Sequence, residues 1–63
     1  MSFAENFKTA RKKGGYTQQD IADMLGLNRT SISKYESGDA MPQSKMLQKI
    51  SEIFEMSIDD LFR

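Results

Sequence analysis

Three short segments of this chain share one pattern, and that pattern marks where helices begin. The segments are YTQQDI, LNRTSI and MSIDDL, which start at residues 16, 27 and 56. In each, a hydrophobic residue is followed by Thr, Asn or Ser, then two residues, then Asp or Ser, then Ile or Leu. The polar second residue is typical of a helix N-cap, and the flanking hydrophobic pair has the spacing of a hydrophobic staple. Helices are therefore predicted to start at Thr17, Asn28 and Ser57.

Two further helices have their own start signals. Ser2 is followed three residues later by Glu5, as in a capping box, and Pro42 precedes an apolar stripe at helical spacing. Glycines that can end a helix follow three segments, at Gly14-Gly15, Gly26 and Gly38. The predicted helices cover residues 2–13, 17–25, 28–37, 43–55 and 57–62. The expected fold class is all-α: a compact five-helix domain in which residues 1–63 form a single unit.

The composition excludes several classes of function. The chain has 63 residues and contains neither cysteine nor histidine, so it lacks the usual ligands of zinc and the usual general base. No pair of carboxylates marks an evident catalytic cleft, so an enzyme is not expected. No catalytic residue, metal site or cofactor is predicted. No apolar run approaches the ~20 residues that a membrane-spanning helix needs, and a cytoplasmic location is expected.

The distribution of charge is more informative than the total. Nine basic and nine acidic residues give a net charge of zero, which argues mildly against nucleic-acid binding. However, residues 1–38 carry six basic and four acidic side chains, net +2, and residues 39–63 carry three basic and five acidic, net −2. An ordinary solvated surface explains this imbalance as well as a positive binding face does. The same two readings are open for Lys8, Lys12 and Lys13 on the first helix.

The helix predicted over 28–37 has an unusual outer face. Ile32 and Tyr35 fall on one side of a helical wheel and can join the core. The other side combines short hydroxyls with two cations and no acid: Arg29, Thr30, Ser33, Lys34 and Ser37. Arginine can bind O6 and N7 of guanine in the major groove, and Ser and Thr can bond several bases. This face favours DNA reading, and the polar face of a small helical bundle is the alternative.

The segment TQQDIADMLGLNRTSISKYESG has the order helix, glycine-containing turn, helix. With the residues around it, it resembles the phage repressor and Cro family, also called the xenobiotic-response-element-type helix-turn-helix regulators. The matching residues are Arg11, Thr17-Gln18, Ile21-Ala22, Leu25–Leu27, Ile32-Ser33, Tyr35–Gly38, Pro42, Leu47, Ile50, Phe54 and Ile58. The resemblance implies a lambda-repressor-like DNA-binding fold. It also implies a sequence-specific transcriptional regulator, expected to be a repressor, that reads the major groove with helix 28–37.

The chain departs from the family pattern in three places. Ser51 stands where the family often has alanine, and Gly14 is expected to add flexibility beside the usual Gly15. The loop over residues 39–42 lacks Lys and Arg, although some relatives contact phosphate from that region. A basic contact from this loop is therefore not expected.

The resemblance assigns roles to eight polar side chains. The expected base-reading residues are Arg29, Thr30, Ser33 and Lys34, and the expected phosphate-contacting residues are Thr17, Gln18, Asn28 and Ser37. Arg29 is the first choice for a base contact, whereas Lys34 could reach a base or a phosphate. Arg11 and Glu36 resemble the family's ion pair between the first and third helices, a structural role.

The partner implied by the resemblance is a double-stranded DNA operator with two half-sites, read by a homodimer. Phe54, Ile58 and Leu61 match core positions of the family, so Ile53 and Phe62 are expected at the dimer interface. Two alternatives are a monomer that pairs only on DNA and a dimer made by a region beyond these residues. The rival function is a protein-interaction module of the same fold, such as an antitoxin-like partner protein, which the zero net charge slightly favours.

Overall fold

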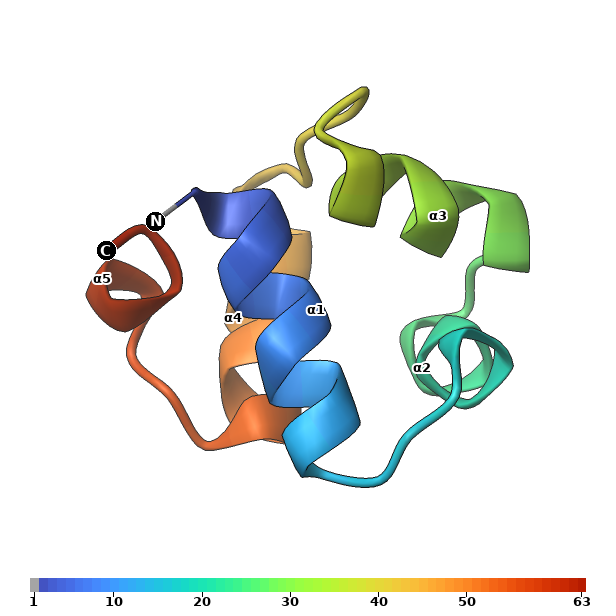
Figure 1. The fold of residues 1–63 in the computed structure, drawn as a ribbon, viewed down its shortest axis with the longest axis horizontal. Helices are drawn as coiled ribbons and strands as arrows, with labels where there is room; N and C mark the ends of the chain where they lie inside the picture. The colour runs from blue at the N-terminus through green and yellow to red at the C-terminus, as the bar shows by residue number, and fades with distance from the viewer. Residues whose placement is uncertain (1) are drawn as a thin grey trace.

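The structure, a computed structural model that describes residues 2–63, contains five helices (Figure 1). They are α1 (Phe3–Lys13), α2 (Gln18–Leu25), α3 (Arg29–Ser37), α4 (Ser44–Phe54) and α5 (Ile58–Leu61). No strand occurs in the described residues, and the all-α prediction is confirmed. Each predicted helix is present and begins one residue later than predicted, because the predicted first residue is its N-cap. The predictions for the last two helices also ran one residue too far.

Four of the predicted N-cap residues form the expected side-chain hydrogen bonds. The side chains of these four accept a hydrogen bond from the backbone N–H three residues later: Ser2, Thr17, Asn28 and Ser57. At α2 the bond is reciprocal, because the backbone N–H of Thr17 donates to the carboxylate of Asp20 over 2.9 Å. These bonds satisfy amide groups that the first helical turn leaves free. The start of α4 differs, since Gln43 makes no side-chain cap bond.

Three helices end at the predicted glycines, and α4 ends differently. Gly26 and Gly38 adopt left-handed conformations, with φ of 70° and 85°, and end α2 and α3. The end of α4 was not predicted from glycine, because Glu55 takes the left-handed position there with φ of 54°. A side chain in this conformation costs about 1–2 kcal/mol relative to the right-handed region.

Gly14 and Gly15 have different reasons to be glycine. Gly15 is left-handed, with φ of 77°, whereas Gly14 has an ordinary right-handed conformation. A Cβ atom on Gly14 would lie 2.7 Å from the ring of Tyr16. The absence of a side chain at Gly14 therefore makes room for Tyr16 and does not simply add flexibility.

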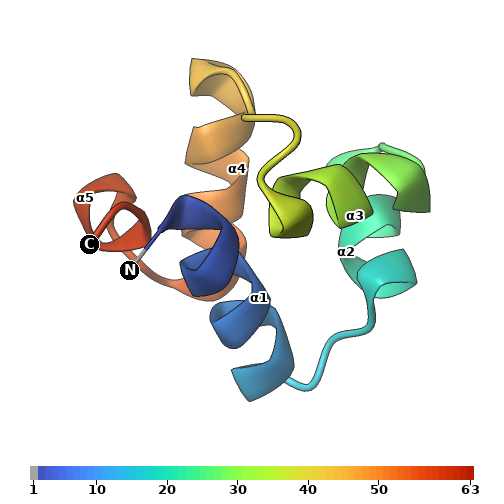
Figure 2. The same cartoon turned by 45° about the horizontal axis from the view of Figure 1, so that its top comes forward.

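The core is centred on α1, which has the α2–α3 pair on one side and α5 on the other, with α4 behind it in the view of Figure 1 (Figures 1 and 2). Phe7 is fully buried, and its ring centroid lies 5.3 Å from that of Phe54 and 6.0 Å from that of Tyr35. The buried hydrophobic residues come from all five helices: Phe3, Phe7, Ile21, Ala22, Leu25, Ile32, Tyr35, Ile50 and Leu61. No helix in residues 2–63 is both long and apolar enough to cross a membrane.

Two polar side chains tie the C-terminal segment to the rest of the domain. Asn6 is almost completely buried, and its Nδ2 donates to the backbone carbonyl of Leu61 over 2.9 Å, with the carbonyl of Arg63 at 3.3 Å. The hydroxyl of Ser51 donates to the backbone carbonyl of Met56 across the turn between α4 and α5. This bond gives a physical reason for serine at a position where the family often has alanine.

The apolar residues near the C-terminus are distributed differently from the prediction. Leu61 is fully buried, and Phe54 and Ile53 pack against the core. Ile58 was expected in the core, and this expectation is wrong, because its side chain is 36% exposed. The reason is that α5 is a single turn, so it can bury only one face, which Leu61 occupies. Phe62 is 45% exposed, as the prediction required.

Candidate nucleic-acid interface

Helices α2 and α3 form a helix-turn-helix. The turn is fixed by left-handed Gly26 and by a hydrogen bond from the backbone N–H of Leu27 to the carbonyl of Ala22, 2.8 Å long. Ala22 is fully buried, and its small side chain belongs to the core. Ile32 and Tyr35 anchor α3 in the core, which leaves the opposite side of the helix facing outward.

The outward side of α3 carries the side chains that the sequence singled out. All five are exposed: Arg29, Thr30, Ser33, Lys34 and Ser37. Arg29, Thr30 and Ser33 line one shared hollow at the front of the helix. Lys34 lies one helical turn after Thr30 and lines a neighbouring hollow with Met41, at the loop between α3 and α4. The structure therefore places all four predicted base-reading residues on the outward side of α3, with Lys34 also bordering the α3–α4 loop.

A chain of hydrogen bonds links the front of α3 to α1. Arg29 Nε donates to Gln18 Oε1 over 3.3 Å, and Gln18 Nε2 donates to Glu36 Oε1 over 3.3 Å. Arg11 binds Glu36 through two nitrogens, with Nε–Oε2 and Nη2–Oε1 distances of 2.6 and 3.1 Å. The remaining Nη1 of Arg11 donates to the backbone carbonyl of Tyr16 over 2.9 Å. Side chains from all three helices are therefore held in one network.

The Arg11–Glu36 ion pair predicted from the resemblance is confirmed. Its two side chains are only 10% and 5% exposed. A two-pronged guanidinium–carboxylate contact fixes orientation as well as distance. Because the charges are nearly desolvated, removal of either partner would leave the other without compensation, at a cost of about 3–5 kcal/mol. The pair therefore fixes the position of α3 relative to α1.

The predicted phosphate-contacting residues have different hydrogen-bonding capacity. Thr17 and Asn28 use a side-chain oxygen as the acceptor of the helix cap, which leaves the hydroxyl proton and the amide N–H groups as donors. The hydroxyl of Ser37 instead faces the carboxylate of Asp39, 2.9 Å away, and the carbonyl of Lys34, 3.2 Å away. The geometry favours a phosphate role least for Ser37, because the Asp39 carboxylate would repel a phosphate there.

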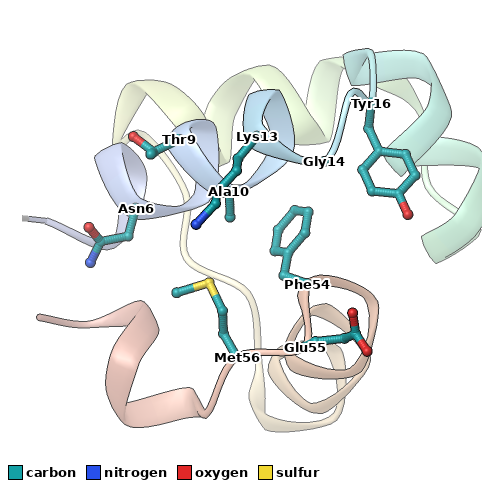
Figure 3. A pocket seen from close by; sticks show the side chains of 9 residues that line it. All are labelled: Asn6, Thr9, Ala10, Lys13, Gly14, Tyr16, Phe54, Glu55 and Met56. Carbon is teal, nitrogen blue, oxygen red and sulfur yellow. The ribbon is translucent and has the colours of Figure 1, made fainter.

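Two basic residues that the sequence left undecided also border this surface. Lys8 and Lys12 line a groove between α1 and α3, together with Ser33 and Ser37. Lys13 instead lines a separate hollow beside Phe54 and Met56 on the other side of α1 (Figure 3). Helical spacing could have predicted this division: Lys8 and Lys12 are four residues apart and share a helix face, whereas Lys13 follows Lys12 directly and does not.

Comparisons with known proteins agree with this geometry. The family model described as helix-turn-helix matches residues 7–61. An SPbeta prophage-derived transcriptional regulator of Bacillus subtilis is 44% identical over 61 residues, covering 97% of this chain and 56% of the relative. The cryptic phage CTXphi transcriptional repressor of Vibrio cholerae is 41% identical over 61 residues, covering 97% of this chain and 54% of the relative. The chain thus spans about half the length of these curated relatives.

A solved structure shares the whole fold. The P22 c2 repressor, crystallised with a synthetic operator, superposes with a TM-score of 0.93 at 25% identity, covering 100% of this chain and 96% of that one. Residues 7–61, which the family model matches, contain the complete α2–turn–α3 unit and the Arg11–Glu36 pair. Because helix-turn-helix regulators are not enzymes, these matches also support the expectation that the chain is not an enzyme. This chain belongs to the helix-turn-helix family, together with these phage and prophage transcriptional regulators.

Proposed function

We propose that this chain binds double-stranded DNA sequence-specifically and regulates transcription as a repressor. The observation that carries the proposal is the outward face of α3, where exposed Arg29, Thr30 and Ser33 share one hollow on a helix anchored by buried Ile32 and Tyr35. The repressor role follows the phage repressors to which the chain is similar. Those relatives come from bacteria and their phages, so the proposed place of action is the cytoplasm.

The proposed base contacts begin at Arg29. Its Nε is bound to Gln18, so the two terminal nitrogens keep the free N–H groups that fit O6 and N7 of guanine. Thr30 and Ser33 lie beside it and supply short donors, acceptors and one methyl group. Lys34 lies one turn further along α3, at the loop before α4, so its longer side chain contacts either a neighbouring base or a phosphate.

The proposed phosphate contacts come from the starts of α2 and α3. Helix N-termini carry a partial positive charge and free amide groups, which favour anions. Thr17 and Gln18 stand at the start of α2, and Asn28 caps α3, and each retains a donor. Ser37 completes the predicted set and has the least support, because its hydroxyl is engaged with Asp39. These contacts position the protein but carry no sequence information.

The proposed assembly on DNA is a homodimer on two half-sites about one helical turn, ~34 Å, apart. Phe62 supports an interface near α5, because the residue is 45% exposed and its ring lies against that of Phe3, tilted by 32° with 5.3 Å between centroids. The exposed Ile58 extends this apolar surface. Ile53, the other predicted interface residue, is partly buried against the core and would contribute only its exposed edge.

Selection of bound duplexes from a random DNA pool tests the function. A regulator enriches a defined motif, and binding to the selected duplex exceeds binding to a scrambled duplex of equal length by at least ~10³-fold. Equal binding to all duplexes would remove sequence specificity from the proposal. If the protein does not bind DNA at low salt and another protein co-purifies with it stoichiometrically, the DNA-binding proposal fails and the protein-interaction module is favoured.

A further inference from the structure

Three lysines of α1 face two different parts of the molecule. Lys8 and Lys12, four residues apart, line the groove between α1 and α3 with Ser33 and Ser37. Lys13 lines the hollow on the opposite side of α1, where its neighbours include Phe54 and Met56 (Figure 3). The run of positive charge in the sequence is therefore divided by the helix into a groove-facing pair and a single residue that faces away.

The groove between α1 and α3 is positively charged. Glu36 is the acidic residue in its lining, and Arg11 neutralises that carboxylate through two contacts. The carboxylate of Asp39 adjoins the groove at Ser37, 2.9 Å from the Ser37 hydroxyl. In residues 2–63 the ion pairs within 4 Å are Arg11–Glu36 and Arg63–Asp60, so neither Lys8 nor Lys12 is paired with an acid. The groove thus keeps two uncompensated charges in a chain whose net charge is zero.

This groove is continuous with the proposed DNA-binding surface. It shares Ser33 with the hollow that holds Arg29 and Thr30, and it shares Gln18 with the hollow at the start of α2. A helix that enters the major groove has a phosphate backbone along each edge of the groove. The elements that flank α3 therefore lie closest to phosphates, and α1 flanks α3 along the side that Ser33 and Ser37 share with Lys8 and Lys12.

We infer that Lys8 and Lys12 bind phosphates of the DNA backbone, which makes α1 a third DNA-contacting element beside α2 and α3. An ammonium group on a flexible stem acts as a point charge that suits a phosphate and does not require a fixed orientation. The neutral domain has little general attraction for DNA, so two localised charges contribute a large share of its electrostatic binding. This inference rests on the proposed function and assigns further residues to it.

The test is the salt dependence of DNA binding by Lys8→Ala/Lys12→Ala. The probes are the duplex selected from the random pool and a scrambled duplex of equal length. Each phosphate contact contributes about 0.9 to the slope of log Kobs against log salt concentration, so loss of two contacts should reduce the slope by about 2. Affinity should fall by a similar factor on both duplexes, because phosphate contacts do not distinguish sequences. Alanine preserves helix formation at these exposed positions.

The matched control is Lys13→Ala/Lys49→Ala, which removes the same two charges from exposed positions outside this groove. Its slope should equal that of the wild type. An unchanged slope in Lys8→Ala/Lys12→Ala, or an equal loss in the control, would overturn the inference while the proposed function stands. A wild type that binds neither duplex would overturn both. Thermal melts verify that all variants are folded, and Lys8→Gln/Lys12→Gln provides a second form of the test.

Discussion

Gln18 and Arg29 begin two different helices and are joined by a hydrogen bond, 3.3 Å long, from Nε of Arg29 to Oε1 of Gln18. The other end of the Gln18 amide is held by Glu36, which is held in turn by Arg11. Gln18 therefore connects the proposed base-reading residue to the buried ion pair. An arginine with one nitrogen held loses less freedom when its other nitrogens bind a base.

Gln18→Ala should reduce affinity on every sequence and should also reduce specificity. The first effect follows from the loss of the proposed phosphate contact, and the second from releasing Arg29. Titrations on the selected and scrambled duplexes measure both. Gln19→Ala is the matched control, because Gln19 is exposed and bonds to Asp23 within its own helix. Specificity equal to that of the wild type would mean that the Gln18–Arg29 bond has no role in base reading.

Glu36→Ala should destabilise the fold by about 3–5 kcal/mol, because it leaves the guanidinium of Arg11 nearly buried without its carboxylate. Chemical denaturation of Glu36→Ala, Arg11→Ala and the double variant gives the coupling energy between the two residues. A strongly non-additive result is expected, with the double variant less destabilised than the sum of the two single changes. Simple additivity would show that the pair does not contribute as a unit.

Glu55→Gly should stabilise the domain. Glu55 ends α4 in the left-handed conformation, with φ of 54°, and glycine adopts this conformation without steric cost. The gain should be about 0.5–1 kcal/mol, after the greater freedom of glycine in the unfolded chain is subtracted. Glu52→Gly is the control, because Glu52 is exposed inside the same helix and its change should cost about 1 kcal/mol. A loss of stability in both variants would contradict this explanation.

Phe62→Lys should shift the free protein from dimer to monomer if α5 forms the interface. The exposed ring would be replaced by a charge that repels its symmetry-related copy. Sedimentation equilibrium of the free protein, with titrations on duplexes carrying one and two half-sites, measures the effect. Met41→Lys is the control, since Met41 is exposed in the α3–α4 loop. An unchanged mass, with equal affinity for both duplexes, would exclude an interface at Phe62.

The sequence predicts the helices of this fold well because their starts depend on local contacts. A cap such as Thr17 and its partner Asp20 are three residues apart, so a short motif contains the whole interaction. The buried and exposed faces of α3 also follow from helical spacing. The Arg11–Glu36 pair spans 25 residues and was expected only because the chain resembles a known family.

The failures of prediction involve contacts between distant side chains or very short elements. No motif indicates that Gln18 bridges Arg29 and Glu36, because this depends on how three helices pack. The exposure of Ile58 follows from the single-turn length of α5, which the apolar pattern alone does not fix. The phosphate role of Ser37 stays a prediction, and the contact of its hydroxyl with Asp39 depends on the conformation of the loop that follows α3.

The central claim is that α3 reads base pairs through Arg29, and Arg29→Ala tests it most directly. The measurement is the ratio of affinities for the selected and the scrambled duplex, compared between wild type and variant at one salt concentration. Arg29→Ala should lose about 1–3 kcal/mol on the selected duplex, and the ratio should fall, with preference relaxed at the base pair that Arg29 contacts. An unchanged ratio, even with weaker binding overall, would contradict the assignment of Arg29 as a base-reading residue.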